Sequence, residues 1–360
     1  MKQLYKKDHY VPRRAWRLLN SCLSVVQTFS RLLSAKLTKP PQVNRILLSN
    51  WASLGDVLLS TSVVHALKKH FPTIQIGFLV SSNSKQVLEH CREIDWIHTL
   101  DPWDSPNKTR FGRLLNLMKH YLFSSTRVIK EIKKINYDHA IELRPFFPNT
   151  ITVLSRAQIP HIIGFNSSGN TPLLSKCVPW VGNDYVKNCY KDLLIHLGLQ
   201  REEMDLKCLV EIPAAVGVQF DHPYIIFHLC SSVKEKDVSI AFWAALYEKC
   251  KAKGLTVYFT GKGARDRSMI QQITSDLKEN LCDQLTWSQL CSVIKNSKGI
   301  VSVDSVPIHI AAALSVPFIV LFQRTHELEL WFPTDSKGVY FDMNQPVDFV
   351  YIQSLIDQWH

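Results

Sequence analysis

Three short segments of the sequence carry groups that bind anions, and each directly follows an apolar run. They are residues 230–236 with Ser231, Ser232 and Lys236, residues 260–266 with Gly261 and Gly263, and residues 303–309 with Asp304, Ser305, Val306 and His309. Hydroxyls and a lysine can hold phosphate oxygens, and glycines let a ligand approach the backbone. A helix N-terminus adds partial positive charge. These are the groups that a nucleotide diphosphate requires.

The third segment has the clearest local pattern. Residues 299–303 predict a strand and residues 305–314 a short helix, with Pro307 in its first turn and Pro317 after its end. Asp304 lies between the two elements, where a carboxylate can cap the helix. His309 begins the second turn, within reach of the same ligand. The pattern leaves open whether Asp304 binds a ligand or only caps the helix.

A second carboxylate, Asp56, lies at the corresponding point of an earlier strand–turn–helix segment. Residues 43–49 predict a strand, and an amphipathic helix runs from Asp56 to the Phe71-Pro72 pair. Gly55 is the only glycine of the turn, which excludes a dinucleotide fingerprint and a phosphate-binding P-loop. A carboxylate at this position commonly interacts only with the positive end of the helix dipole. The small or apolar residues 51–55 would also let another molecule approach it.

Apolar runs alternate with helical segments in both halves of the chain. Further strands are expected near residues 74–80, 96–100, 137–143, 162–165, 224–229, 254–260 and 316–322, and helices near 84–91, 150–158, 184–199, 264–277 and 286–295. The alternation predicts an α/β protein with mostly parallel sheets covered by helices. In a parallel sheet, the three anion-binding segments would share the carboxyl edge, where ligands bind.

The chain divides into four parts on composition. We expect a basic amphipathic extension at residues 1–42, a first Rossmann-like domain at 43–215, a second at 216–345 and a terminal helix at 346–360 that packs back on the first domain. The 360 residues suffice for two domains of ordinary size. Nine cysteines without a CxxC pair indicate reduced core residues of a cytoplasmic protein. Neither the cysteines nor the 14 histidines form a zinc pattern.

Positive charge is concentrated at the N-terminus. The first 44 residues contain nine lysines and arginines against Asp8 alone, so a nucleic-acid-binding body is not indicated. Apolar residues recur at helical spacing in residues 19–33, but the segment is too short and too polar to span a bilayer. Residues 1–40 could therefore bind an anionic membrane surface. Alternatively, the helix packs on the surface of this protein or of a partner. Residues 107–135 predict a second basic helical region.

Five motifs together resemble the ADP-heptose:lipopolysaccharide heptosyltransferases, glycosyltransferase family 9, over about residues 43–335. Residues 45–48 and 53–61 are similar to the family's first strand and SxGDxxxxxP-like start, residues 137–143 and 162–165 to two mid-domain signatures, residues 304–313 to its DSGPxHxAAA motif, and residues 321–325 to its LFGPT motif. The resemblance implies a GT-B fold, with two Rossmann-like domains facing each other across a cleft, and an inverting transfer that needs no metal or other cofactor.

The resemblance also implies roles for individual residues. Asp56 would be the general base, and Ser53, Gly55 and Arg144 would contact the acceptor. Lys236 would neutralise the leaving diphosphate beside Ser231 and Ser232. Asp304 would contact sugar hydroxyls, Ser305 phosphate, and His309 the loop or the nucleotide sugar, with Gly261, Gly263, Val306 and Thr325 completing the donor site. The implied partners are ADP-heptose and a lipid-linked oligosaccharide at the inner face of the cytoplasmic membrane.

The sequence departs from the family pattern mainly in the donor half. Val306 replaces a glycine, and a β-branched residue there resists positive φ. Gln323 and Arg324 replace Gly-Pro before Thr325, and His326 replaces an acidic residue. Two alternatives follow. The protein uses another nucleotide sugar or a protein acceptor, or it is a catalytically impaired glycosyltransferase-like binding protein.

Overall fold

The computed structural model describes residues 42–102, 125–146, 149–168, 170–218 and 220–359. These residues form two compact units that divide between Cys208 and Leu209, with Asn183–Val186 grouped with the second unit. The predicted basic extension, apart from Gln42, and residues 107–124 of the second basic region lie outside the described residues. Within the described part of the chain, every helix is too short or too polar to cross a membrane.

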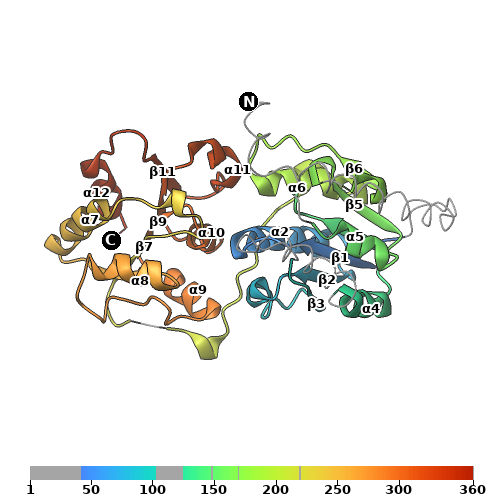
Figure 1. Ribbon diagram of the computed structural model, residues 1–360, viewed down its shortest axis with the longest axis horizontal. Coiled ribbons are helices and arrows are strands. Elements are labelled where there is room, and N and C mark those ends of the chain that lie inside the picture. The colour runs from blue at the N-terminus through green and yellow to red at the C-terminus, as the bar shows by residue number, and fades with distance from the viewer. Residues whose placement is uncertain (1–41, 103–124, 147–148, 169, 219, 360) are drawn as a thin grey trace, which may run out of the picture. The chain divides into compact units, whose positions relative to one another are not determined.

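The first unit is built on a parallel six-stranded sheet (Figure 1). Its strands are β1 (Arg45–Asn50), β2 (Gln75–Val80), β3 (Trp96–Thr99), β4 (His139–Glu142), β5 (His161–Phe165) and β6 (Lys176–Val178), in the order β3-β2-β1-β4-β5-β6. Residues of β1 after Arg45 are all buried, as expected for a strand covered on both faces. Each of these strands except β6 was predicted from the sequence.

Helices and short turns connect or follow these strands. They are α2 (Leu54–His70), α4 (Ser125–Ile135), α5 (Ile151–Arg156) and α6 (Val186–Leu194), with short 3₁₀ turns η1 (Asn83–Val87), η3 (Asn166–Ser168), η4 (Thr171–Leu173), η5 (Ile195–Leu197) and η6 (Arg201–Glu203). One core cluster joins Leu47 of β1 and Leu79 of β2 to Ile129 and Ile132 of α4 and Leu154 of α5. Those two helices therefore cover one face of the first sheet.

The second unit contains a parallel five-stranded sheet. Its strands are β7 (Tyr224–His228), β8 (Thr256–Thr260), β9 (Ile300–Val303), β10 (Phe318–Phe322) and β11 (Gly338–Asp342), in the order β11-β10-β9-β7-β8. Its helices are α7 (Ile240–Ala252), α8 (Ala264–Gln271), α9 (Trp287–Asn296), α10 (Val306–Ala313), α11 (Leu328–Trp331) and α12 (Phe349–Asp357), with 3₁₀ turns η7 (Ala214–Val216), η8 (Lys234–Lys236) and η9 (Thr325–Glu327). The prediction of two Rossmann-like parallel sheets is confirmed.

The C-terminal helix belongs to the second unit, whereas the sequence-based expectation was that it packs back on the first domain. Helix α12 lies beside α7 (Figure 1) and buries Ile352 and Ile356 in the core of the second unit. A Cβ on Gly299 would stand 2.2 Å from the indole of Trp359, so the aromatic ring packs directly on the start of β9. The amphipathic pattern identified an apolar face, but it carried no information on which sheet would cover that face.

The domain boundary also differs from the predicted 215–216. Residues from Leu209 on belong to the second unit, and the segment 214–218 lies on α9, where Val218 N donates to Ser292 Oγ (3.1 Å) and Asn296 Nδ2 to Val218 O (3.3 Å). The composition change at the predicted boundary therefore lies within the second unit. Composition did not reveal this, because a polar segment can still pack on a helix.

Two predicted helices are shorter than expected. The prediction for 264–277 ends as α8 at Gln271, because Thr274 Oγ1 donates to Glu279 (3.0 Å) and accepts from Asp276 N (3.1 Å). The prediction for 84–91 is reduced to η1, where Ser84 Oγ donates to Ala52 O (3.1 Å). In both segments, hydroxyl side chains offer hydrogen bonds that compete with helix continuation.

Candidate active site

Asp56 lies in the first turn of α2, directly after β1. Ser53 is the N-cap residue, and the two side chains form a capping box. Asp56 Oδ2 accepts from Ser53 N at 3.1 Å and from the Ser53 hydroxyl. Gly55, between them, is buried. The half-buried carboxylate is thus held through one oxygen in a fixed orientation at the carboxyl edge of the first sheet.

Arg144 provides positive charge beside this carboxylate. Its Nη1 donates to Trp51 O (2.8 Å), which attaches the loop after β4 to the loop after β1. Burial lowers the pKa of Arg144, while the neighbouring carboxylates of Asp56 and Glu142 act to raise it. Its Nε is buried without a hydrogen-bond partner among the described residues. The predicted acceptor-side residues Ser53, Gly55 and Arg144 are thereby brought around Asp56.

Glu142, to which the sequence analysis assigned no role, is a fully buried carboxyl group at the end of β4 (0% exposed). Its Oε2 accepts from Thr150 N (2.7 Å) and Thr150 Oγ1 (2.6 Å), and its Oε1 from Arg144 N (3.2 Å). Burial raises its pKa to about 7, against the lowering effect of the Thr150 hydrogen bonds. An acidic residue ending an apolar strand was the sequence signal that could have identified it.

In the second unit, the three predicted segments meet at one edge of the sheet. Residues 303–309 follow β9, residues 230–236 follow β7 and residues 260–266 follow β8, and these three parallel strands are neighbours in that order. Their carboxyl ends therefore lie side by side, as the sequence predicts. The strand order explains why the three segments are neighbours. What each segment can bind depends on its side-chain contacts.

The centre of this edge is a network of four charged side chains. Lys236 Nζ lies 2.5 Å from Asp304 Oδ2 and 3.0 Å from Glu327 Oε2. Arg324 Nη2 lies 2.7 Å from the other oxygen of Glu327, Oε1. The three side chains other than Arg324 are at most 15% exposed. The sequence analysis missed Glu327, which lies one residue after the position where the family carries an acid.

Asp304 forms an ion pair with Lys236 and does not cap α10. Ser305 occupies the N-cap position of α10, so Asp304 lies just outside the helix and turns to the lysine. Burial raises the pKa of Asp304, and the Lys236 ammonium opposes that effect. For Lys236, burial acts to lower the pKa, but the carboxylates of Asp304 and Glu327 prevail and raise it. Each charge therefore favours the ionised form of its partner.

Ser231 and Ser232 do not share one role. The Ser231 hydroxyl donates to Val233 O (2.9 Å) and accepts from Val233 N (3.0 Å), so it closes the turn before η8. Asp237 Oδ1 accepts from Ser231 N (3.2 Å), which fixes the same loop. Ser232 is exposed. Lys236 is the last residue of η8, and from this position its side chain reaches Asp304.

The two glycines after β8 are required for different reasons. Gly263 has φ +97° and ψ 177°, a conformation that L side chains rarely adopt, and its N–H donates to Asp283 Oδ1 (2.8 Å). Gly261 lies against the carboxyl group of Asp266, which a Cβ would approach to 2.4 Å. Burial raises the pKa of Asp266. Both glycines thus shape the loop that begins α8.

His228 is a third residue, after Glu142 and Glu327, for which the sequence predicted no role. It ends β7, and its Nδ1 lies 3.0 Å from Thr260 Oγ1 and its Nε2 3.5 Å from Ser305 Oγ. Burial lowers its pKa to about 4, so the imidazole is neutral at neutral pH. It connects the ends of β8 and β9 and orients the hydroxyl of Ser305. A polar residue closing the apolar run YIIFH was the available signal.

The remaining donor-side residues lie at the same edge. Val306 is the first residue of α10, so its backbone is helical and no positive φ is needed there. His309 is buried within α10 (6% exposed), and Thr325 is exposed at the start of η9. The strain expected at Val306 from loss of the family's glycine is therefore absent from the described structure.

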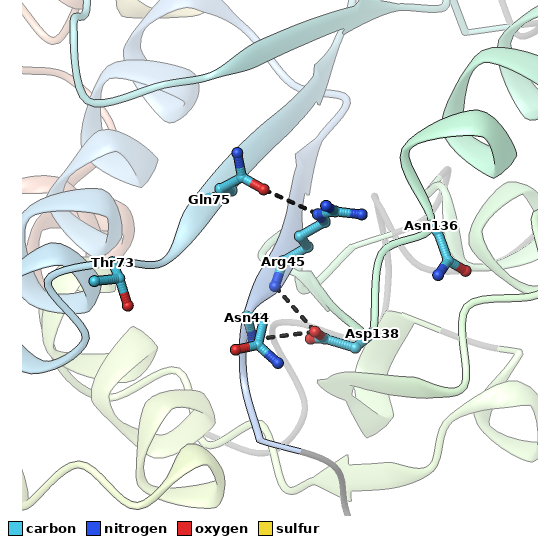
Figure 2. A pocket seen from close by; sticks show the side chains of 6 residues that line it. All are labelled: Asn44, Arg45, Thr73, Gln75, Asn136 and Asp138. Atoms are coloured by element: carbon cyan, nitrogen blue, oxygen red, sulfur yellow. Dashed lines mark hydrogen bonds between the residues drawn. The ribbon is translucent and has the colours of Figure 1, made fainter.

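A cavity of about 500 Å³ opens at the opposite edge of the first sheet (Figure 2). Asp138 accepts there from Asn44 N and Arg45 N, both at 3.0 Å, and Arg45 Nε donates to Gln75 Oε1 (2.9 Å). These bonds join the starts of β1, β2 and β4. The cavity therefore lies at the amino ends of the strands, whereas ligands of such sheets bind at the carboxyl ends. Its polar residues hold neighbouring strands together, and we assign it no ligand.

Comparisons with known proteins agree with this architecture. The sequence model of glycosyltransferase family 9 (heptosyltransferase) matches residues 125–346, more than half of the chain. Lipopolysaccharide heptosyltransferase 3 of Escherichia coli is 23% identical over 309 residues, covering 80% of this chain and 85% of that protein. Lipopolysaccharide core heptosyltransferase OpsX of Haemophilus influenzae is 21% identical over 283 residues, covering 75% of this chain and 76% of that protein.

Solved structures show the same fold. A glycosyl transferase family 9 structure from Veillonella parvula superposes with a TM-score of 0.72 at 17% identity, covering 89% of this chain and 99% of that one. Escherichia coli ADP-heptose lps heptosyltransferase II gives 0.68 at 17% identity, covering 87% and 99%. With its two parallel α/β sheets and the family match across both units, this chain belongs to glycosyltransferase family 9, the heptosyltransferases.

Proposed function

We propose that this enzyme transfers heptose from ADP-heptose to the inner core of lipopolysaccharide with inversion at the anomeric carbon. The observation that carries the proposal is the Lys236–Asp304 pair, 2.5 Å apart at the carboxyl edge of the second sheet, in a chain that belongs to the heptosyltransferase family. Curated relatives that it resembles over most of their length are named as lipopolysaccharide heptosyltransferases.

Asp56 is the proposed general base. Oδ2 is engaged by the Ser53 backbone N–H, so the carboxylate is oriented and its other oxygen can accept the proton of the acceptor hydroxyl. As that O–H bond breaks, the oxygen forms a bond to the anomeric carbon of the heptose. The bond from that carbon to the diphosphate oxygen breaks on the opposite face, and ADP leaves with the electron pair.

Lys236 stabilises the leaving diphosphate in this proposal. A lysine ammonium acts as a positive charge where negative charge develops in the transition state. Asp304 holds the ammonium in place and offers its carboxylate to sugar hydroxyls, and Ser305 offers a hydroxyl oriented by His228. Ser231 contributes by fixing the loop. Ser232, Gly261, Gly263, Val306, His309 and Thr325 remain proposed donor-side residues. No step of this transfer needs a metal or another cofactor.

Arg144 is the proposed contact for an anionic group of the acceptor, assisted by the small residues Ser53 and Gly55. It is cationic, lies beside Asp56 and has a buried Nε without a partner among the described residues. A cation next to the base would orient the hydroxyl of an acceptor that carries an anionic group nearby. We further propose that the enzyme works in the cytoplasm, peripherally at the inner face of the membrane, with residues 1–40 on anionic lipid.

The test is a mass-spectrometric assay of ADP-heptose consumption in the presence of a lipid-linked inner-core acceptor. Wild-type protein should form ADP and a heptosylated acceptor, and Asp56→Ala should reduce the rate at least about 100-fold, as expected for loss of a general base. ADP-heptose left intact by the wild type would contradict the proposal. Nucleotide binding without turnover would instead favour a glycosyltransferase-like binding protein.

A further inference from the structure

Glu327 occupies a position between two cations of the donor edge. Its Oε2 lies 3.0 Å from Lys236 Nζ and its Oε1 lies 2.7 Å from Arg324 Nη2. Each cation thus contacts a different oxygen of one carboxylate, and Glu327 is only 14% exposed. A terminal phosphate group presents the same feature, two anionic oxygens on one centre, to a pair of cations.

The charges of this cluster balance only while Glu327 takes part. Lys236 and Arg324 contribute two positive charges, and Asp304 and Glu327 contribute two negative ones. Lys236 is at most 15% exposed, and a charge this far from water requires a partner. An arriving diphosphate brings its own negative charge to Lys236. One resident carboxylate then becomes surplus at this edge and must move away from the cations.

Glu327 is the carboxylate placed to leave. Asp304 directly follows β9 and is 6% exposed, so its position is fixed by the sheet and by α10. Glu327 is the last residue of the short turn η9, and the other two residues of this turn, Thr325 and His326, are exposed. A short surface turn opens at lower free-energy cost than a strand end, because fewer buried contacts hold it.

Building on the proposed function, we propose that Glu327 is a resident anion that the donor's diphosphate displaces from Lys236 and Arg324, and that Arg324 then binds the diphosphate directly. In the unliganded protein, Glu327 neutralises the two cations and holds η9 in place. On binding, the diphosphate takes over both contacts, and Glu327 turns to solvent. Arg324, a departure from the Gly-Pro of the family motif, thereby supplies a second cation to the donor site.

The experiment measures binding of ADP, with adenosine as a ligand that lacks phosphate, to the full-length protein by calorimetry. Glu327→Gln should bind ADP at least about fivefold more tightly than wild type, because no carboxylate has to be displaced. Arg324→Gln should bind ADP at least about fivefold more weakly. Neither variant should change the affinity for adenosine.

Matched controls exclude a general effect of net charge. Glu329→Gln removes a carboxylate two residues away, on an exposed position, and Lys337→Gln removes an exposed cation. Both should bind ADP within about twofold of wild type. If Glu327→Gln fails to fold, Glu327→Asp keeps the charge but withdraws it by one methylene, and it should also bind ADP more tightly, by a smaller factor.

Unchanged or weaker ADP binding by the Glu327 variants would overturn the inference, as would unchanged ADP binding by Arg324→Gln. These failures are distinguishable from failure of the proposed function. A wild type that consumes ADP-heptose while the variants bind ADP as it does removes only the role of Glu327 and Arg324. A wild type that binds ADP, with the expected changes in the variants, but leaves ADP-heptose intact removes only the transfer reaction.

Discussion

The two sheets each place an aspartate between a strand and the following helix, yet the two carboxylates have different environments. Asp56 lies inside the first turn of α2, is half-buried and is bonded to its own N-cap residue Ser53. Asp304 lies before the N-cap of α10, is buried and is paired with Lys236 from another loop. A shift of a few residues relative to the helix start separates a carboxylate bonded within its own helix turn from one paired with a cation of another loop.

The same contrast extends to the buried carboxyl group of each edge. In the first unit, Glu142 is held by neutral donors, the amide and hydroxyl of Thr150, and burial raises its pKa to about 7. In the second unit, Asp304 is held by an ammonium group that opposes the effect of burial. The proposal of proton transfer at the first edge and anion binding at the second rests on this difference.

The sharpest test of the contrast replaces each aspartate by asparagine. Asp56→Asn should lower turnover about 10²- to 10⁴-fold, the usual contribution of a general base. Its unfolding free energy should stay within about 1 kcal/mol of wild type, since asparagine can still accept from Ser53 N. Asp304→Asn should lower the unfolding free energy by about 1–3 kcal/mol, because Lys236 loses one buried partner. Turnover assays and urea unfolding measure the two effects.

Equal stability losses in both variants, or unchanged turnover in Asp56→Asn, would show that the two aspartates do the same structural work. Ser53→Ala serves as the control on the first side. It removes the capping hydroxyl but keeps the carboxylate, so turnover should fall far less than in Asp56→Asn.

Glu142→Gln tests how the first edge holds a buried carboxyl group. With a folded-state pKa of about 7 and an ordinary value of 4.5, the folded protein binds the proton more tightly than the unfolded chain. The group's contribution to stability is complete below about pH 4.5 and is lost as the pH rises through 7. The variant should lack this slope, which amounts to up to about 1.4 kcal/mol per pH unit and about 3 kcal/mol in total.

Urea unfolding of wild type and Glu142→Gln at pH 5 and pH 8 provides the measurement. The wild type should lose stability relative to the variant at the higher pH. A constant difference between the two proteins across this range would mean that Glu142 is ionised in the folded state throughout.

The last effect concerns stability alone and is expected at the loop after β8. Gly263→Ala should lower the unfolding free energy by about 1–3 kcal/mol, because φ +97° with ψ 177° strains any L residue. No atom lies within 4 Å of the added Cβ, so the loss would come from the backbone and not from a clash. Gly217→Ala, where the backbone has φ −60°, is the matched control and should be nearly neutral. A neutral Gly263→Ala would show that the loop relaxes without cost.

Local patterns predicted much of this molecule. The apolar runs became strands, and Asp56, Ser305 and the loops after β7, β8 and β9 fell at carboxyl edges because parallel connections leave no other place for them. Helix ends were less certain: hydroxyl side chains such as Thr274 stop α8 at Gln271. The apolar face of the C-terminal helix lies in the core of the second unit, and its sequence did not indicate this because such a face fits any apolar surface.

The sequence by itself therefore determined the two-sheet α/β architecture, the positions of the loops along each edge and the family resemblance, because these depend on periodicity and residue order. Only the tertiary structure decided which charges meet. Lys236 and Asp304 are 68 residues apart in sequence, Glu327 comes from the turn η9, and His228 comes from the end of β7. Such contacts depend on which strands are neighbours and on how deeply each side chain is buried, and local sequence encodes neither.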